Sequence, residues 1–450
     1  MTNRIKLCKG LDIHLQGTAR KHKDAVMKGG EYALQPSAFV GLVPKVIVKE
    51  GEHVKVGEAL FVDKAHPEMT FASPVSGIVT AVERGERRKV LSVRVKADDE
   101  QQFVEFAKRD VSAMKGKDVK AALLEAGLFG YVNQLPYAVV ANASDEPKAI
   151  FVSALRDMPL AGDFEFELQG NEKDFQTGLT ALSKIAKTYL GVGAKQTSAA
   201  LLEAKDVEVN IFDGPCPAGN VGIQVNHLDP VNKGDIVWTV DPTAVLFFGR
   251  LFNTGKVNLT RTIAIAGSEI NNPAYVDILV GAPLKSIPQI AALEGSASVR
   301  LINGNPLTGT QTSIDGFVGG HTSEITAIPE GDHADEMLGW ILPRFNQFSA
   351  NRSYFSWLFG KKKYALDTRV KGGERHMIMS GEYDKVLPMD IYGEYLIKAI
   401  ITGDIDRQEQ LGIYEVSPED FALAEFVDSS KLELQKIVRE GLDILRKENA

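Results

Sequence analysis

Three glycine-rich segments have the residue types that hold a nucleotide phosphate. Residues 191–196 (GVGAKQ) begin like the GxGxxG loop of dinucleotide-binding proteins, but Gln196 stands where the third glycine belongs. This segment also follows a predicted helix, whereas a dinucleotide loop follows a strand and opens a helix. Residues 213–222 do follow a predicted strand, yet their prolines remove amide donors that a phosphate would need. We therefore predict a rigid crossover turn at 213–222 and a plain turn at 319–321.

Lys64 is the side chain with the strongest signal for covalent modification. Residues 40–95 around it alternate in short apolar runs separated by Glu-Gly, Val-Gly and Ser-Gly pairs, which predicts half-buried strands joined by tight turns. With Asp63-Lys64-Ala65 the order resembles a biotinyl or lipoyl carrier domain, whose lysine bears the swinging cofactor. Here residues 66–68 (HPE) lengthen the turn beyond that pattern, and the proline removes a ladder donor. The segment predicts the carrier fold more strongly than the modification.

The histidines and cysteines are not spaced as ligands of a metal ion or an iron–sulfur cluster, and no catalytic motif is visible. The eight histidines make no HxxxH or HExxH pair, and we expect His227 and His321 to be surface or hydrogen-bonded residues. The two cysteines, Cys8 and Cys216, lie far apart and outside any CxxC pair, whereas an iron–sulfur cluster takes four thiolates or two thiolates with two histidines. We expect no metal, no cluster and no catalytic residues, since GxSxG, P-loop and kinase signatures are also missing.

Composition narrows the class of protein. The chain has 450 residues, 44% hydrophobic and 24% charged, which is typical of a globular protein of about three domains. Its net charge of −8 argues against a nucleic-acid partner, because phosphate neutralisation needs a basic face. Short basic runs such as residues 361–363 (KKK) are expected to be solvated. No secretory signal or transmembrane run is visible, and two lone cysteines favour a reducing cytoplasm.

These segments require a multidomain α/β scaffold, and hydrophobic periodicity outlines its first half. Residues 1–98 are predicted to form an N-terminal segment that contains the barrel-sandwich, lipoyl-like module at 40–95. Residues 99–256 alternate strands with helices, which indicates a Rossmann-like α/β domain with a mainly parallel sheet. Asp241 and Pro242 are the predicted N-cap and first residue of one helix. The expected helices are 117–126, 175–190 and 241–252, and the expected strands are 149–155 and 207–212.

The second half changes rhythm twice. Residues 257–330 carry short strands around one short helix, which predicts a small β-grasp-like (SLBB) domain. Residues 331–450 begin with a connecting segment and continue as a helical C-terminal domain. Its last helix, at 432–445, has a clear apolar face.

Motifs spread along the whole chain point to one family. The sequence resembles the NqrA family, the A subunits of the sodium-translocating NADH:quinone oxidoreductases of bacteria, which are similar in architecture to the C subunit of Rnf complexes and to the NADH-binding flavoprotein subunit of complex I. The matching segments are 9–12 (KGLD), 60–64 (LFVDK), 71–77 (FASPVSG), 84–88 (RGERR), 214–219 (GPCPAG), 249–252 (GRLF), 372–375 (GGER) and 387–391 (LPMDI).

The resemblance carries functional expectations. It implies a cofactor-free peripheral subunit on the cytoplasmic face of the bacterial inner membrane, docked chiefly on the membrane-embedded B subunit. The complex oxidises NADH, reduces ubiquinone or menaquinone and exports Na⁺, with FAD, FMN, riboflavin and iron–sulfur centres held by other subunits. A quinone is the ligand that this chain itself would approach. Aromatic residues beside glycine or proline turns are the candidates for quinone proximity: Tyr32, Phe39, Phe129, Tyr131 and Tyr137.

Two other functions stay open from the residues alone. One is a carrier protein modified at Lys64, which would show an added lipoyl or biotinyl mass. The other is a stand-alone nucleotide-dependent oxidoreductase that uses the α/β domain, which would bind NADH as an isolated chain.

Overall fold

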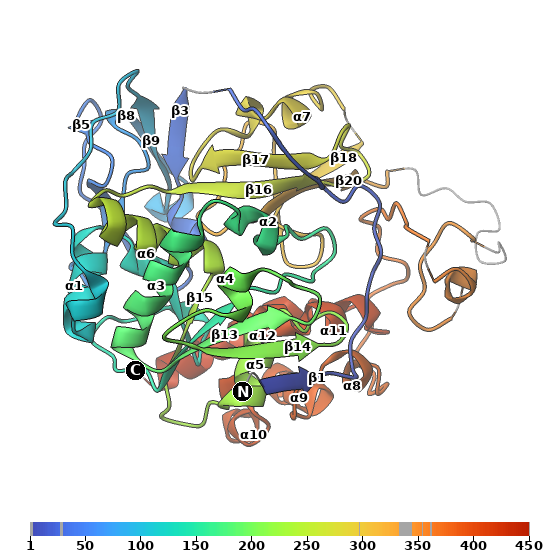
Figure 1. The fold of residues 1–450 in the computed structure, drawn as a ribbon. Helices are drawn as coiled ribbons and strands as arrows, with labels where there is room; N and C mark the ends of the chain where they lie inside the picture. The colour runs from blue at the N-terminus through green and yellow to red at the C-terminus, as the bar shows by residue number, and fades with distance from the viewer. Residues whose placement is uncertain are drawn as a thin grey trace.

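A seven-stranded sheet lies at the centre of the molecule (Figure 1). The computed structural model describes residues 3–27, 30–296, 298–332, 344–352, 354–360 and 362–449. The strand order is β1-β14-β13-β12-β15-β10-β11, and the first five strands run parallel. They are β1 (Asn3–Lys6), β14 (Glu208–Asp213), β13 (Thr188–Gly193), β12 (Ala149–Ser153) and β15 (Val237–Val240). The antiparallel edge is β10 (Val132–Leu135) and β11 (Val139–Val140).

The order of connections creates a switch point beside β12. The chain moves outward from β12 through β13 to β14 and then returns to the opposite side of β12 as β15. Loops that leave the carboxyl ends of β12 and β15 therefore diverge, which is where open α/β sheets form their ligand crevice.

Helices cover one face of this sheet closely. They are α1 (Gly116–Glu125), α3 (Glu172–Ile185) and α6 (Pro242–Thr254), with the short α2 (Phe164–Leu168) and α4 (Ala199–Leu202) nearby. The predicted helices at 117–126 and 241–252 are confirmed, and the Asp241 carboxylate accepts the Thr243 amide as the N-cap of α6. Helices α3 and α6 touch backbone to backbone at Gly249, where an added Cβ would lie 1.7 Å from the Asp174 carbonyl oxygen. That contact explains the glycine of the GRLF segment.

C-terminal helices cover the other face of the sheet. They are α5 (Val221–Leu228), α8 (Tyr383–Val386), α9 (Gly393–Thr402), α10 (Ile405–Gln410), α11 (Ala422–Val427) and α12 (Leu434–Glu448), and all but α5 follow residue 380 (Figure 1). The predicted amphipathic helix is confirmed as α12, whose buried residues are Leu434, Val438, Gly441, Leu442 and Leu445.

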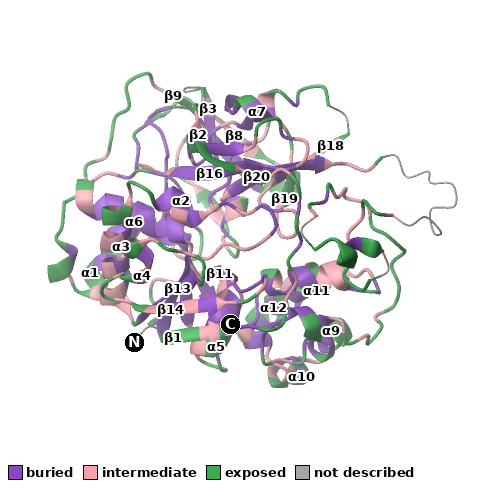
Figure 2. Cartoon of the chain, turned by 45° about the vertical axis from the view of Figure 1, so that its right-hand side comes forward, coloured by how far each residue is buried: buried purple, intermediate pink, exposed green. Residues whose placement is uncertain are grey.

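Strand β12 shows how the sheet joins the two cores. Ile150 and Val152 belong to the core that contains α3 and α6, whereas Ala149 and Phe151 belong to the core that contains α12. Successive side chains of a strand point to opposite faces. The continuous apolar run at 149–155 therefore reflects burial on both sides. The neighbouring β13 is buried in the same way (Figure 2).

Two smaller β units complete the molecule. A six-stranded sheet has the order β19 (Thr310–Thr312), β18 (Val299–Asn303), β20 (Glu324–Pro329), β16 (Thr260–Ala266), β17 (Ala274–Leu279) and β2 (Arg20–Asp24), with the short helix α7 (Pro288–Ala291) beside it. The module predicted at 40–95 also takes in β3 (Glu31–Leu34). It pairs a four-stranded sheet of β3, β9 (Val90–Ala97), β8 (Gly77–Arg84) and β5 (His53–Val54) with a three-stranded sheet of β4 (Pro44–Val46), β6 (Ala59–Asp63) and β7 (Thr70–Ala72).

The strands before residue 40 join three sheets, because β1 extends the central sheet beside β14, β2 pairs with β17, and β3 pairs with β9 of the module. One expected helix differs from the structure. The helix predicted at 175–190 is wrong beyond Ile185, since Ala186 turns to extended backbone and residues 188–193 form β13. All six residues of β13 are buried between the two helical layers, so packing overrides the helical pattern.

The long segment after residue 330 contains short ordered pieces. Residues 333–343 and Lys361, which the predicted connection and basic run include, lie outside the described residues. Across the described ranges, no helix is both long and apolar enough to cross a membrane.

The covering of the sheet by α12 can be tested with one core and one surface side chain of similar size. Leu442 is fully buried, whereas Ile444 two residues later is 49% exposed. We expect Leu442→Ala to lower the free energy of unfolding by about 2–4 kcal/mol, because it leaves a cavity beneath the central sheet. Urea titration should show a change below ~0.5 kcal/mol for Ile444→Ala. Equal effects of the two substitutions would contradict the packing described.

Candidate functional site

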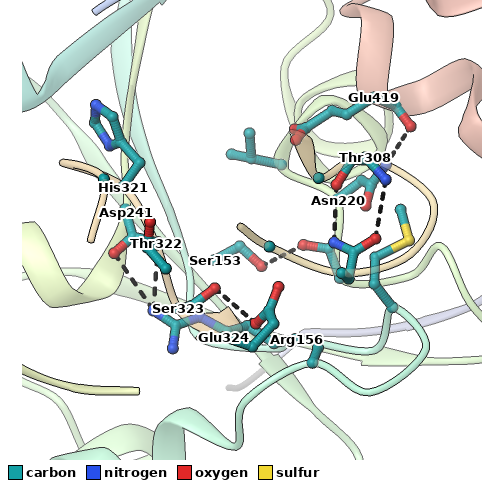
Figure 3. Close-up of a pocket in the computed structure, with 18 of the residues that line it drawn as sticks. Ser153, Arg156, Asn220, Asp241, Thr308, His321, Thr322, Ser323, Glu324 and Glu419 are labelled. Carbon is teal, nitrogen blue, oxygen red and sulfur yellow. Dashed lines mark hydrogen bonds and ion pairs between the residues drawn. The ribbon is translucent and has the colours of Figure 1, made fainter. Parts of the chain in front are cut away.

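A crevice of about 710 Å³ opens at the switch point of the central sheet (Figure 3). Its floor comes from the loops that follow β12, β14 and β15, at residues 153–158, 219–221 and 239–242. Its other wall comes from loops of the six-stranded sheet, at 303–310 and 319–324, and Glu419 closes one side from the helical C-terminal region. The crevice thus joins three units that are far apart in the sequence.

Arg156, which directly follows β12, holds the floor of the crevice together. Its guanidinium pairs with Glu167 at 3.0 Å and with Asp241 at 3.3 Å, and its side chain is only 11% exposed. Thr243 accepts a hydrogen bond from Arg156 at 2.8 Å and donates one to Glu167 at 2.9 Å. Burial penalises ionisation of Asp241, but Arg156 and Arg261 hold its pKa below the usual range. Both carboxylates of this cluster are therefore committed to the protein itself.

The charges around the crevice are mostly negative. Arg156 is the one basic residue among the described residues that line it, against four acidic ones. The acidic residues are Asp157, Asp241, Glu324 and Glu419. A dianionic phosphate would meet repulsion there, because like charges at short range in a partly dry site oppose binding.

Two backbone amides of the loop after β14 are already occupied by carboxylates. The Gly219 amide donates to Asp157 at 3.0 Å, and the Cys216 amide donates to Asp12 at 3.0 Å. Asp241 caps α6, and the Asp420 carboxylate lies against Gly222 at the start of α5. Helix N-termini and free amides are what a nucleotide phosphate needs. The two amides and the start of α6 are therefore already bonded within the protein and are not free to hold a phosphate.

Burial shifts the pKa of three titratable groups of the crevice toward the neutral form: it raises the pKa of Asp157 and of Glu419 and lowers the pKa of His321. Burial, with the nearby Asp12, raises the pKa of Asp157 to about 6, although the Gly219 amide acts against it. Burial and the adjacent Arg261 lower the pKa of His321 to about 4, so its ring is neutral at neutral pH. His321 Nε2 is shielded and has no hydrogen-bond partner among the described residues.

Ser153 is the hydroxyl at the end of β12, and its contacts are structural. Its Oγ donates toward the carbonyl of Gly219 at 2.7 Å and accepts from the Gln224 amide at 2.8 Å. Histidine or carboxylate is the usual activating partner of a serine nucleophile. The crevice thus offers hydrogen-bond acceptors and positioning groups rather than an activated nucleophile.

The structure brings two of the five predicted quinone-proximal aromatics together. Phe39 and Tyr131 meet edge to face at 5.4 Å, and both also contact the ring of His321. Phe129 packs on Trp238 at 5.4 Å, and Tyr32 lies in β3 of the module. None of the five aromatic residues lines the crevice. His321, which contacts two of them, does line it.

Tyr137 lies apart from the other four. Its backbone carbonyl accepts from Arg439 on α12 at 2.5 Å, and its hydroxyl accepts from Asn449 at 3.3 Å. Tyr137 therefore sits where the antiparallel edge of the sheet meets the last helix.

His321 departs from the expectation of a surface or satisfied residue. It is half-buried between Phe39 and Tyr131, and its Nε2 lacks a partner within the described ranges. Sequence reasoning also missed Arg156 and Asp157. Their signal was position, because both follow directly on the predicted buried strand at 149–155, and functional loops leave the carboxyl ends of such strands.

The turn that carries Lys64 is folded back on itself. The Asp63 amide donates to the Met69 carbonyl at 3.0 Å, and Asp63 Oδ1 accepts from the amides of Val43 and Ala65 at 3.3 and 3.4 Å. Residues 64–69 between β6 and β7 form a longer, pinned loop, with Met69 buried. This confirms the sequence-based interpretation that the turn is not the tight tip of a carrier domain.

Fold and crevice together define the class of protein: a mixed α/β chain of a barrel-sandwich module, an α/β domain with a switch-point crevice and an SLBB-like domain. Family models match each part. They are the NqrA N-terminal barrel-sandwich hybrid domain over residues 5–98, the NqrA second alpha/beta domain over 114–257 and the NQRA C-terminal domain over 262–313.

Full-length relatives agree with these matches. The A subunits of the Na(+)-translocating NADH-quinone reductases of Vibrio atlanticus and Neisseria meningitidis are 33% and 34% identical, over 99% of this chain and 100% of theirs. That of Haemophilus influenzae is 33% identical over the same shares. The chain belongs to the NqrA family.

One solved structure gives a weaker likeness. A chain of the NAD⁺-reducing [NiFe]-hydrogenase in the air-oxidized state matches 51% of this chain and 52% of its own length, with 12% identity and a TM-score of 0.32.

The raised pKa of Asp157 predicts a measurable effect on stability. Between the ordinary value of 3.8 and about 6, the folded protein binds more protons than the unfolded chain, so the free energy of unfolding falls as pH rises through this window. We expect Asp157→Asn to raise the free energy of unfolding by about 1 kcal/mol at neutral pH and by nothing below pH ~4. Asp99→Asn, at an exposed site, is the control. A gain that does not change with pH would contradict the buried carboxyl.

Proposed function

We propose that this chain is the cofactor-free scaffold and docking subunit of a Na⁺-translocating NADH:quinone reductase. Membership in the NqrA family makes the chain a subunit of that respiratory complex. Through its other subunits the complex oxidises NADH, reduces ubiquinone or menaquinone and exports Na⁺. Catalytic and electron-carrying groups belong to those subunits in this proposal, and FAD, FMN, riboflavin and iron–sulfur centres are held there.

The observation that carries the cofactor-free role is the set of carboxylates in the switch-point crevice. Asp157 takes the Gly219 amide, Asp241 caps α6, and Asp420 lies at the start of α5. Each of these positions is one where a nucleotide-binding α/β protein presents free amides to phosphate. Asp157 and Asp241 bind amides that a flavin or NADH phosphate would otherwise use, and Asp420, which accepts from Ser417 and Asn220, fills the space beside Gly222. This disfavours a stand-alone nucleotide-dependent oxidoreductase.

The resemblance of two domains to cofactor-binding folds is consistent with the same proposal. The parallel sheet with its switch point between β12 and β15 is Rossmann-like, and the two-sheet module is lipoyl-like in its order of strands. In the α/β domain, the loop that would bind a phosphate has its Gly219 amide bonded to Asp157. In the module, the loop that would carry a modified lysine is held by hydrogen bonds to Asp63. Modification at Lys64 is disfavoured for the same reason.

Docking is proposed on the membrane subunits, chiefly the B subunit, at the cytoplasmic face of the bacterial inner membrane. The support is the family membership together with the finding that no described helix can cross a membrane. Detergent extraction and purification through a tag on this chain should recover the membrane subunits in equal amounts. Recovery of the chain alone at low salt would contradict the docking role.

Quinone proximity is proposed for the aromatic segments, with Tyr137 the most accessible of the five candidates. Tyr32, Phe39, Phe129 and Tyr131 are all buried, whereas Tyr137 is partly exposed. In the whole complex, Tyr137→Phe is expected to raise the KM for quinone severalfold with little change in kcat. Tyr392→Phe, at a 69% exposed site that precedes α9, is the control. Unchanged kinetics in both variants would remove Tyr137 from the quinone path.

The cofactor-free role makes a direct prediction for the isolated chain. Because the crevice carboxylates occupy the phosphate positions, the purified protein should show no flavin absorbance band and no heat of NADH binding by calorimetry. Intact mass should equal that of the unmodified sequence, since Lys64 bears no lipoyl or biotinyl group. A stoichiometric yellow chromophore, or NADH affinity in the micromolar range, would overturn the proposal.

A further inference from the structure

Residues 344–363 differ in charge from the rest of the chain. This segment (RFNQFSANRSYFSWLFGKKK) contains five basic residues and no aspartate or glutamate, whereas the whole protein has a net charge of −8. Six of its residues are aromatic. We call the described residues of this segment, 344–352, 354–360 and 362–363, the basic aromatic knob.

The apolar side chains of the knob point into solvent. Trp357 is 53% exposed and Leu358 is 55% exposed, and both lie in the short 3-10 helix at Phe355–Leu358. Phe345, Phe355 and Phe359 are between 42% and 50% exposed. Large apolar residues gathered at one exposed place mark an interaction site rather than ordinary surface.

Cations hold these rings in place. Phe345 and Phe355 stack with centroids 5.6 Å apart, and Lys362 lies over Phe359 at 6.0 Å. The Arg352 guanidinium lies over the Trp357 ring at 5.7 Å. Such pairs keep rings and charges side by side in the free protein. The knob therefore presents aromatic rings and positive charge as one preformed surface.

The base of the knob is tied to the body of the protein. Lys362 donates to the Phe345 carbonyl at 2.6 Å and so closes the segment into a loop. Phe348 packs against Tyr364 at 5.9 Å and against Phe426 of α11 at 6.0 Å. In Figure 1 the orange segment with its single helical turn stands out from the body to the right. The tip is thus fixed in orientation and free of covering elements among the described residues.

We infer that the basic aromatic knob inserts into the headgroup region of an anionic lipid bilayer. Trp and Phe rings are favoured at that depth, and Lys and Arg beside them are attracted to anionic headgroups by about 1 kcal/mol each. One short anchor gives reversible binding, which suits a peripheral subunit. This goes beyond the proposed function, because docking on a membrane protein requires no lipid contact by this chain.

The composition favours lipid over a protein partner. Protein interfaces are enriched in aromatic residues and Arg, but Lys is depleted in them. The run at the end of the knob is made of lysines, and a lipid surface accepts them because their ammonium groups stay hydrated among phosphates. The positive charge of the knob is complementary to an anionic bilayer. The protein as a whole has a net charge of −8, which such a bilayer would repel.

Vesicle flotation of the full chain tests the inference. The protein should float with phosphatidylcholine vesicles that contain about 30% phosphatidylglycerol and should bind pure phosphatidylcholine at least tenfold more weakly. Trp357→Ala with Leu358→Ala, and separately Lys362→Glu with Lys363→Glu, should each weaken binding to the anionic vesicles at least tenfold. Added salt should weaken the native protein's binding.

Matched controls separate the knob from general stickiness. Tyr392 and Tyr395 form an exposed aromatic pair on the helical region, and Arg87 and Arg88 form an exposed basic pair in the module. Alanine at the first pair, or glutamate at the second, should leave vesicle binding within twofold of the native value. Thermal unfolding should show all variants folded, because none of the altered side chains is buried.

Fluorescence provides a second measurement that does not depend on affinity. The chain has three tryptophans: Trp238 is fully buried, Trp357 is exposed, and Trp340 lies outside the described residues. The measurement is therefore made in a Trp340→Phe background, where a blue shift on addition of anionic vesicles should vanish when Trp357→Phe is added. No flotation of the native chain, or flotation that the knob variants leave unchanged, would overturn the inference. So would knob variants that float normally but fail to co-purify with the membrane subunits, since the knob would then bind protein. Normal co-purification without flotation would leave the proposed function standing.

Discussion

A parallel sheet has to be covered on both faces, and the rest of this structure follows from that constraint. Every residue of β12, β13 and β15 is buried, because helices α3 and α6 lie on one side and the C-terminal helices on the other. Neither face of such a sheet is exposed to solvent. The C-terminal region is therefore part of the central domain, although more than 100 residues of chain separate α12 from the last strand of that sheet.

The same constraint brings three units to one crevice. Once α12 and the 3-10 turn at Pro418–Phe421 cover the second face, Glu419 and Asp420 reach the carboxyl ends of the strands. The six-stranded sheet supplies His321 and Glu324 from the opposite side. The resulting cluster of carboxylates around Arg156 stabilises the loops internally. It also uses the amides and helix N-termini on which phosphate binding in related folds depends.

Polar groups in the interior and apolar groups at the surface are treated differently in this protein. The Gly219 amide in the crevice and the amides of the Lys64 loop are bonded to the chain's own carboxylates, whereas the basic aromatic knob leaves its rings exposed at the surface. Buried polar groups find partners within the protein, and exposed apolar groups are kept only where something covers them. This distribution of buried polar and exposed apolar groups is consistent with a protein that acts through contacts at its surface.

The sequence by itself determined the local structure and the family. Alternation with Gly turns predicted the module, Asp241-Pro242 predicted the start of α6, and the apolar face at 432–445 predicted α12. The sequence also predicted that the two cysteines form no ligand set and that the turn after Lys64 is longer than in a carrier domain, because both follow from residue spacing alone. Only the tertiary structure decided that β1 and β2 join two sheets other than those of the module, that residues 188–193 are a strand, and that Arg156, Asp157, His321 and Glu419 converge. These features depend on contacts between separate segments of the chain, and periodicity within one segment carries no information about them.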